Sequence, residues 1–255
     1  QAILNADIET GGKHYDRALV EIAHPHMKNQ IYFPKSVLKT VKLENGYHGG
    51  AIGYIMGSGD EVPEALRSLG CDVTLLDDQA LTTGNLASFQ TIITGVRAYN
   101  TRGILRHVQP RLLEYVRNGG TLIVQYNTPS GLLINSIGPY PFTLGNDRVC
   151  VETAPVSFIK PDQPLLRIPN RITAADFEGW TQERGLYFAS QWDERYEPIL
   201  SSHDPNESGR TGGMLYARYG NGIFIYSSYA WFRQLPSGVP GAYRLFLNMI
   251  SAGKK

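Results

Sequence analysis

The chain has 255 residues, of which 42% are hydrophobic and 18% charged, and its formal net charge is +1. This balance is typical of a globular protein with a sizeable core. It argues against a nucleic-acid-binding protein, because binding to the phosphate backbone needs clustered Lys and Arg and the chain has no long basic run. It also argues against a membrane span, since no apolar stretch approaches the ~20 residues that cross a bilayer.

The two cysteines, Cys71 and Cys150, are too few for a disulfide framework. No CxxC motif or Cys/His cluster offers a zinc site, and we expect neither a metal nor a cofactor. Cys71 begins a predicted strand and Cys150 lies within an apolar run, so we expect both to be small core residues. The first residues do not resemble a signal peptide, and we expect the chain to be a piece of a longer protein.

Residues 1–47 differ in pattern from the rest of the chain. The runs "RALVEIAHPHM" and "VLKTVKLENG" alternate in a β-like way, and "YFPKS" separates them. We interpret this segment as the end of a preceding β domain followed by a linker, and residues 48–255 as one α/β domain.

A strand–helix–strand rhythm begins at residue 48. The apolar run "AIGYIM" predicts a strand, and "GSGDE" a turn in which Asp60 caps a helix that has Pro63 in its first turn. The acids in "GSGDE" would repel a phosphate, so a capped turn is the better interpretation than an anion loop. The run "DVTLL" predicts the next strand, completing a right-handed βαβ unit.

The rhythm repeats through "FQTIITG" as a strand, "PRLLEYVRNGG" as a helix and "TLIVQY" as another strand. Strands that are apolar almost throughout indicate a parallel sheet covered on both faces. Beyond about residue 128 the runs become short and β-like. Near the end, "YGNG" predicts a hairpin turn, and "VPGAYRLFLNMI" an amphipathic helix.

Several long motifs together resemble the C-terminal region of large bacterial PIG-L/LmbE-type deacetylases. They are "IGYIMGSGDEVPEALRSLGCDVTLL", "GVRAYNT", "LLEYVRNGGTLIVQYNT", "GPYPF", "DFEGWTQERGLYF" and "LPSGVPGAYRLFLNMI". More distantly, the region is similar to class I glutamine amidotransferase-like and trehalose-utilisation (ThuA-like) proteins. The resemblance implies a three-layer αβα, flavodoxin-like sandwich with added β-rich segments.

The residues that active members of these families need are missing. An amidotransferase carries a nucleophilic Cys at a tight strand-to-helix turn, whereas the strand that we take as equivalent ends in "VQYNT". PIG-L/LmbE deacetylases bind a metal through an "HPDD"-like motif, but "AHPHM" places His26 and Met27 where the acids belong, which argues against a metal site at His24 and His26. We therefore expect no catalytic residues of either kind.

Polar side chains follow the predicted strands, where ligands bind in open α/β sheets. Arg97 is a forked donor suited to carboxylates or hydroxyl pairs, and tyrosine rings offer flat faces to sugars. The alternative is that these residues cap the strand ends and bond one another. The candidate ligand-binding residues of this edge are Arg97, Tyr99, Asn100, Gln125, Tyr126 and Asn127.

A second group of candidates lies in "DFEGWTQERGLYF". Two carboxylates there, Glu178 and Glu183, are five residues apart and could act as acid and base, as in glycosidases. Asp176, Glu183 and Arg184 could equally form structural ion pairs. The ligand-binding candidates of this segment are Glu178, Trp180, Glu183 and Arg184. The later cluster "SYAWFRQLPSGVPGAYRLF" contains Arg233 and suits an interface or a carbohydrate platform.

We therefore expect a non-catalytic accessory domain of a sugar deacetylase protein, of the N-acetylglucosamine type, that binds carbohydrate or mediates contacts between domains or subunits. A hydrolase acting on carbohydrates or amides through Asp and Glu is the alternative. The expected partners are carbohydrate and the upstream domains of the parent chain, with homo-oligomerisation left open. The resemblance implies an exported, periplasmic setting, but the residues fix no compartment.

Overall fold

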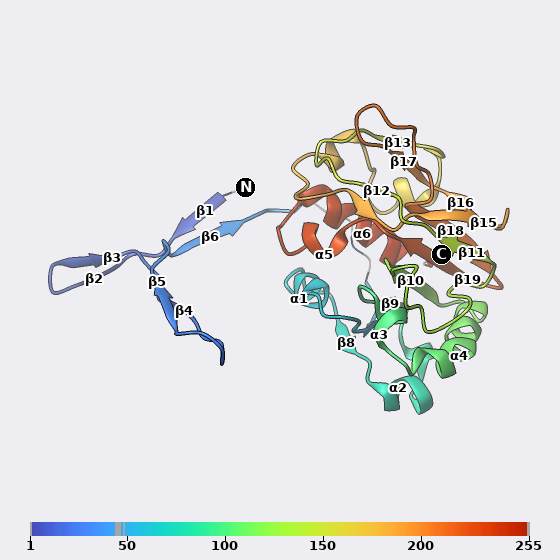
Figure 1. Ribbon diagram of the computed structural model, residues 1–255, viewed down its shortest axis with the longest axis horizontal. Coiled ribbons are helices and arrows are strands. Elements are labelled where there is room, and N and C mark those ends of the chain that lie inside the picture. The colour runs from blue at the N-terminus through green and yellow to red at the C-terminus, as the bar shows by residue number, and fades with distance from the viewer. Residues whose placement is uncertain (1, 44–46, 48, 254–255) are drawn as a thin grey trace. The chain divides into compact units, whose positions relative to one another are not determined.

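The computed structural model describes residues 2–43, 47 and 49–253, and it divides into two compact units between residues 44 and 45 (Figure 1). Each unit is described by itself.

The first unit consists of three antiparallel ladders of two strands each. Among residues 2–38 and 40–43, no residue is buried. A two-stranded hairpin is marginally stable alone in water, so these ladders have little core of their own. That they complete a preceding β domain stays a prediction. The paired strands are β1 (Ala2–Asn5) with β6 (Val37–Thr40), β2 (Ile8–Thr10) with β3 (Lys13–Tyr15), and β4 (Val20–Ile22) with β5 (Gln30–Tyr32).

The second unit is built on a seven-stranded sheet with the order β16-β18-β19-β10-β9-β7-β8. Five neighbouring strands are parallel, and their order, 2-1-3-4-5 along the chain, is that of flavodoxin-like sheets. The antiparallel strand β18 and the short strand β16 extend one side. The strands are β7 (Ile52–Ile55), β8 (Val73–Leu75), β9 (Thr91–Thr94), β10 (Thr121–Gln125), β16 (Glu197–Pro198), β18 (Met214–Tyr219) and β19 (Gly222–Ser227).

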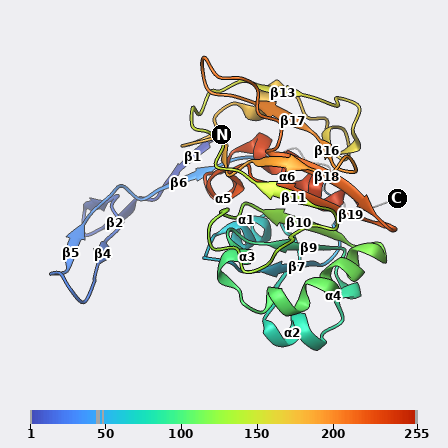
Figure 2. The same cartoon turned by 45° about the vertical axis from the view of Figure 1, so that its right-hand side comes forward.

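Helices cover both faces of the sheet, and Figure 2 shows α2 and α4 on one side and α6 on the other. Successive strand residues face opposite ways, so Leu122 and Val124 pack in the core cluster that includes Leu112 of α4. The fold class expected from the sequence is confirmed. The helices are α1 (Val62–Arg67), α2 (Asp78–Thr83), α3 (Ala98–Thr101), α4 (Leu105–Arg117), α5 (Trp231–Gln234) and α6 (Pro240–Ser251), with 3-10 turns η1 (Leu86–Ser88), η2 (Pro164–Leu166) and η3 (Ala174–Phe177).

The added β-rich segment lies between β10 and β18 in the chain and forms three more antiparallel pairs. It brings residues 183–187 beside the end of β19, where Gly185 pairs with Tyr229 and the hydroxyl of Tyr226 donates to the carbonyl of Tyr187 at 2.8 Å. The pairs are β11 (Phe142–Leu144) with β15 (Ala189–Trp192), β12 (Arg148–Val149) with β14 (Gly185–Leu186), and β13 (Val156–Phe158) with β17 (Leu200–Ser202).

Three local predictions differ from the structure. Cys150, which we expected in the core, is exposed, whereas Cys71 is buried. Helix α4 begins at Leu105, so Pro110 lies inside it rather than near its start; burial of Leu105 and Val108 offsets the missing backbone hydrogen bond. The hairpin loop is Gly220-Asn221 rather than Asn-Gly, because Tyr219 pairs with Gly222 and Gly220 takes the positive φ of 60°. None of the helices within residues 49–253 is long and apolar enough to cross a membrane.

Candidate functional site

A strained strand-to-helix turn lies at the end of β9. Three residues separate that strand from helix α3. The last of them, Arg97, is the N-terminal capping residue of the helix and has φ 57° and ψ 25°. Strand β10, where we expected this turn, runs instead into a long loop that leads to β11. This strand-to-helix turn therefore carries a guanidinium group, which cannot act as a nucleophile.

Three of the candidates at this edge bond to the protein interior. The backbone N–H of Tyr99 donates to Oδ1 of Asn127 at 2.9 Å, and the Tyr99 hydroxyl donates to Oε1 of Gln109 at 2.8 Å. Asn100 accepts from the backbone N–H of Thr128 and donates to its carbonyl, each at 3.0 Å. For Tyr99, Asn100 and Asn127, the alternative interpretation, that strand-end residues bond one another, describes the contacts that we see.

Gln125 belongs to a polar chain that links the end of β10 to β7 and to the loops that follow β7 and β9. Its Nε2 donates to the Tyr54 hydroxyl at 2.8 Å, and that hydroxyl donates to Oδ1 of Asp60 at 2.6 Å. Oδ2 of Asp60 accepts from the backbone N–H of Val96 at 3.1 Å. Burial, reinforced by the Asp60 carboxylate, raises the pKa of Tyr54 well above its ordinary value. Asp60 thus joins two loops across the point where the strand order reverses.

Tyr126 is the centre of a different, solvent-facing group. Its half-buried ring stacks on Tyr187 with centroids 5.8 Å apart and meets Phe232 at 5.3 Å. Its carbonyl accepts from the backbone N–H of Arg97 at 2.8 Å. The exposed Arg97 guanidinium makes no hydrogen bond or ion pair within the described parts of the chain. Burial raises the pKa of Tyr126, and the nearby cations of Arg97 and Arg233 oppose that rise.

An ion pair borders the same group. Nε of Arg233 donates to Oε1 of Glu183 at 3.0 Å, and the Arg233 guanidinium lies 4.8 Å from the Phe232 ring centroid and also donates to Oε1 of Gln182. We call the assembled residues the edge cluster: Arg97, Tyr126, Glu183, Tyr187, Phe232 and Arg233.

Backbone strain is concentrated at the edge cluster. In the described part of the chain, four non-glycine residues have positive φ, and three of them, Arg97, Gln182 and Tyr187, lie in or next to this cluster. Such conformations cost roughly 1–3 kcal/mol each and gather at functional sites. The edge cluster is therefore the strongest candidate for a functional site.

Trp180, Arg184 and Glu178 line a separate cavity of about 540 Å³. Trp180 is buried and its Nε1 donates to the carbonyl of Asp176 at 3.0 Å. Glu183 contacts Arg233, whereas Arg184 contacts Phe177 and Trp180. The second group of candidates is thus divided between two places.

The expected ion pairs exist, with other partners. Asp176 accepts from Nε of Arg244 at 2.8 Å and caps η3 through Thr173, while Glu183 pairs with Arg233. Among the described residues, Arg184 forms no ion pair.

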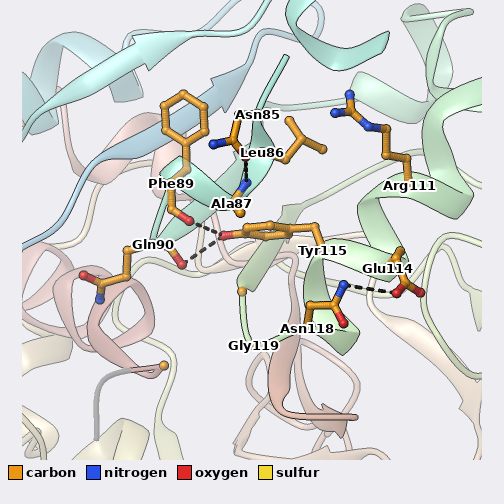
Figure 3. Close-up of a pocket in the computed structure, with 12 residues that line it drawn as sticks. Asn85, Leu86, Ala87, Phe89, Gln90, Arg111, Glu114, Tyr115, Asn118 and Gly119 are labelled. Atoms are coloured by element: carbon orange, nitrogen blue, oxygen red, sulfur yellow. Dashed lines mark hydrogen bonds between the residues drawn. The ribbon is translucent and has the colours of Figure 1, made fainter. Parts of the chain in front are cut away.

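Another cavity, of about 470 Å³, lies at the opposite, amino edge of the parallel strands (Figure 3). The Tyr115 hydroxyl points at the carbonyls of Phe89 and Gln90, at 3.1 and 2.9 Å, and the Arg111 guanidinium donates to backbone carbonyls at the end of α2. Its polar groups serve local structure, so it is a weaker candidate.

The histidines of the first unit do not assemble a metal centre. The rings of His24 and His26 stack with centroids 5.7 Å apart. Across residues 2–43, 47 and 49–253, no three His, Cys, Asp or Glu side chains gather in a way that could hold a metal ion.

Comparison with known proteins shows the fold class. No family model and no curated protein matches the chain. The solved structure of cytoplasmic protein STM3548 from Salmonella typhimurium is similar, with 13% identity, a TM-score of 0.50, and coverage of 92% of this chain and 94% of that one.

Weaker likenesses include two further solved structures. A putative ThuA-like protein from Bacteroides uniformis has 13% identity, a TM-score of 0.49 and coverage of 85% and 95% of the two chains. A putative GMP synthase protein from Thermoplasma acidophilum has 10% identity, a TM-score of 0.45 and coverage of 81% and 96%. The protein has the flavodoxin-like α/β fold that the resemblance to amidotransferase-like and ThuA-like proteins implied.

Three members of the edge cluster are absent from the candidates predicted from sequence: Tyr187, Phe232 and Arg233. Tyr187 and Arg233 lie in segments that we had singled out as rich in aromatic and charged residues, which was the available signal. Nothing in the sequence indicated that these segments meet beside Tyr126.

Proposed function

We propose that the protein is a non-catalytic binding domain that holds carbohydrate at the edge cluster. The observation that carries this proposal is Arg97, whose guanidinium bonds to no described residue at the strained end of β9, beside the stacked rings of Tyr126 and Tyr187. Glycine would adopt this backbone conformation without strain. The presence of arginine is explained if its side chain is needed at this position.

The chemistry of the edge cluster favours a sugar. Tyr126, Tyr187 and Phe232 present aromatic rings, which suit the flat apolar faces of sugar rings. The forked donors of Arg97 suit paired hydroxyls or a carboxylate. The pairing of Glu183 with Arg233 leaves a fixed acceptor and fixed donors at the border of the cluster.

The contacts of the carboxylates favour binding over hydrolysis. Asp176 and Glu183 each accept a hydrogen bond from an arginine, and Glu178 is exposed and lines the cavity of Arg184 rather than the edge cluster. An acid–base pair needs two carboxyl groups that flank one bond of the substrate, whereas Glu178 and Glu183 lie at different places. We further propose, from the sequence resemblance, that the domain serves a multidomain deacetylase of the N-acetylglucosamine type, through this binding or through contacts with other domains.

Calorimetry with chitobiose, cellobiose and N-acetylglucosamine tests the binding proposal. We expect saturable binding of at least one sugar, weakened at least tenfold by Arg97→Ala and by Tyr126→Ala. Arg117→Ala, on the exposed end of α4, is the matched control and should leave the affinity unchanged. Absence of binding across the set would contradict the carbohydrate proposal, and turnover of chromogenic glycosides would contradict its non-catalytic part.

A further inference from the structure

Arg184 is a buried cation that forms no ion pair with any residue that the structure describes. Only 4% of the residue is exposed, and its guanidinium makes no ion pair with any described residue. Nε donates to the carbonyl of Ala154 at 3.0 Å, and Nη1 donates to the carbonyl of Phe177. The guanidinium also lies 5.9 Å from the ring centroid of Phe177 and 5.4 Å from that of Trp180. Buried charges in proteins are ordinarily paired, and this one has no paired anion among the residues described.

The remaining donors of Arg184 are available to a ligand. Nη2 makes no hydrogen bond within the described residues, yet it is not among the fully buried polar atoms that lack a partner. Arg184 lines the cavity of about 540 Å³, together with Phe177, Trp180 and the loop 152–156. The site therefore offers a guanidinium flanked by aromatic rings, within a volume that accommodates a small organic molecule.

The same cavity is also lined by two carboxylates. Glu152 accepts from the backbone N–H of Gln182, and Glu178 has no side-chain partner within the described residues. Two negative charges near one guanidinium disfavour a phosphate dianion and favour a monoanion whose remaining groups donate hydrogen bonds.

We propose that this cavity binds a small monocarboxylate with a flat body, the carboxylate pairing with Arg184 and the body lying against Phe177 and Trp180. A uronic sugar and an aromatic acid both fit this class. The site is separate from the edge cluster, because Glu183 and Arg184 contact different groups, and it does not depend on the function proposed for that cluster.

Calorimetry on the full chain tests whether binding requires the carboxylate of the ligand. Benzoate is compared with benzamide, and D-glucuronate with D-glucose. We expect at least one of the two acids to bind about tenfold more tightly than its neutral counterpart, since a charge-assisted bidentate contact is lost in the latter. Inorganic phosphate should bind more weakly than that acid. Equal binding of acid and neutral partner, stronger binding of phosphate, or no saturable binding of either acid would overturn the proposal.

Two variants locate the binding. Arg184→Met should weaken the binding of the acid at least tenfold, but it also removes two hydrogen bonds that support the fold. Ala174→Phe is a second variant, because Ala174 is exposed and lines the cavity, so a larger side chain obstructs it with little effect on folding. Arg117→Ala, on the exposed end of α4 and outside both sites, should leave the affinity for the acid unchanged. An unchanged affinity in Ala174→Phe, or a loss in Arg117→Ala, would place the binding elsewhere.

Discussion

Oδ1 of Asn127 accepts a hydrogen bond from the backbone N–H of Tyr99 at 2.9 Å, while its Nδ2 donates to the carbonyl of Gln125 at 2.9 Å. The Asn127 side chain is fully buried and joins the loop after β10 to the first residues of α3. It therefore holds the two strand ends from which the edge cluster is built.

Asn127→Ala should lower the free energy of unfolding by about 1–3 kcal/mol, because it leaves a buried N–H and a buried carbonyl without partners. Denaturant titration followed by tryptophan fluorescence measures this, since all three tryptophans lie in the second unit. Asn135→Ala, at an exposed loop position, is the matched control and should stay within about 0.5 kcal/mol of the unmutated protein. Equal stability of the two variants would show that Asn127 does not hold the strand ends.

Two substitutions of Arg97 can distinguish the effect of its left-handed backbone from the effect of its guanidinium group. Arg97→Gly removes the guanidinium but suits φ 57°, so its stability should stay within about 1 kcal/mol of the unmutated protein. Arg97→Val also removes the guanidinium, but a β-branched residue is strained there, so it should be less stable than Arg97→Gly by about 1 kcal/mol or more. Chemical unfolding of the pair decides this, and a valine variant as stable as the glycine variant would be inconsistent with the backbone strain.

The ion pair of Glu183 with Arg233 should be measurable by a double-mutant cycle. Glu183 is nearly buried whereas the Arg233 side chain is 33% exposed, so solvent screens the pair in part. We expect Glu183→Gln to cost about 1–2 kcal/mol of stability. Arg233→Gln in that background should then cost less than it does alone. Strictly additive free energies of unfolding would show that the two side chains are not coupled.

Stability should fall at alkaline pH. Burial raises the pKa of the Tyr229 hydroxyl to about 12, whereas an unfolded tyrosine titrates near 10. Between these values the unfolded chain releases a proton that the native state keeps. The stabilisation is therefore complete below about pH 10 and declines as the pH rises toward 12, by about 1.4 kcal/mol per unit for each such group. Burial also raises the pKa of Tyr99 and Tyr226, which steepens the decline.

Tyr229→Phe provides the comparison. Unfolding titrations between pH 9 and pH 11.5 should show a slope that is smaller by one proton in this variant. The variant also loses the hydrogen bond to Ser202 and should be somewhat less stable at neutral pH. Parallel curves for the two proteins would mean that the Tyr229 hydroxyl ionises alike in the native and unfolded states.

The inner parallel strands were predictable because they are buried on both faces and their sequences are largely apolar, as in "TIIT" and "TLIVQ". The rule that strand ends share one edge correctly brought Arg97 and Tyr126 together. The sequence did not predict which of these side chains face solvent. Beyond the end of a strand, the direction of a side chain depends on the dihedral angles of the loop. Asn127 and Gln125 turn inward, and Arg97 owes its outward position to a left-handed conformation that its residue type does not signal.

The second group of candidates shows a different limit. Glu178, Trp180, Glu183 and Arg184 are close in sequence, yet Glu183 contacts Arg233 while Trp180 and Arg184 line a cavity with Phe177. Closeness in sequence could not reveal this division, because it depends on a bent backbone, with φ 66° at Gln182, and on a partner of Glu183 that lies 50 residues later.

The sheet ends on both sides in strands of very few residues, β8 with three and β16 with two. A long, flat outermost strand offers a row of unpaired N–H and C=O groups on which another chain can continue the sheet, and short strands deny that template. The backbone of this sheet thus disfavours the stacking of copies edge to edge along it. If two copies associate through this unit, we expect the contacts to come from side chains of the loops or of the helices that cover the sheet.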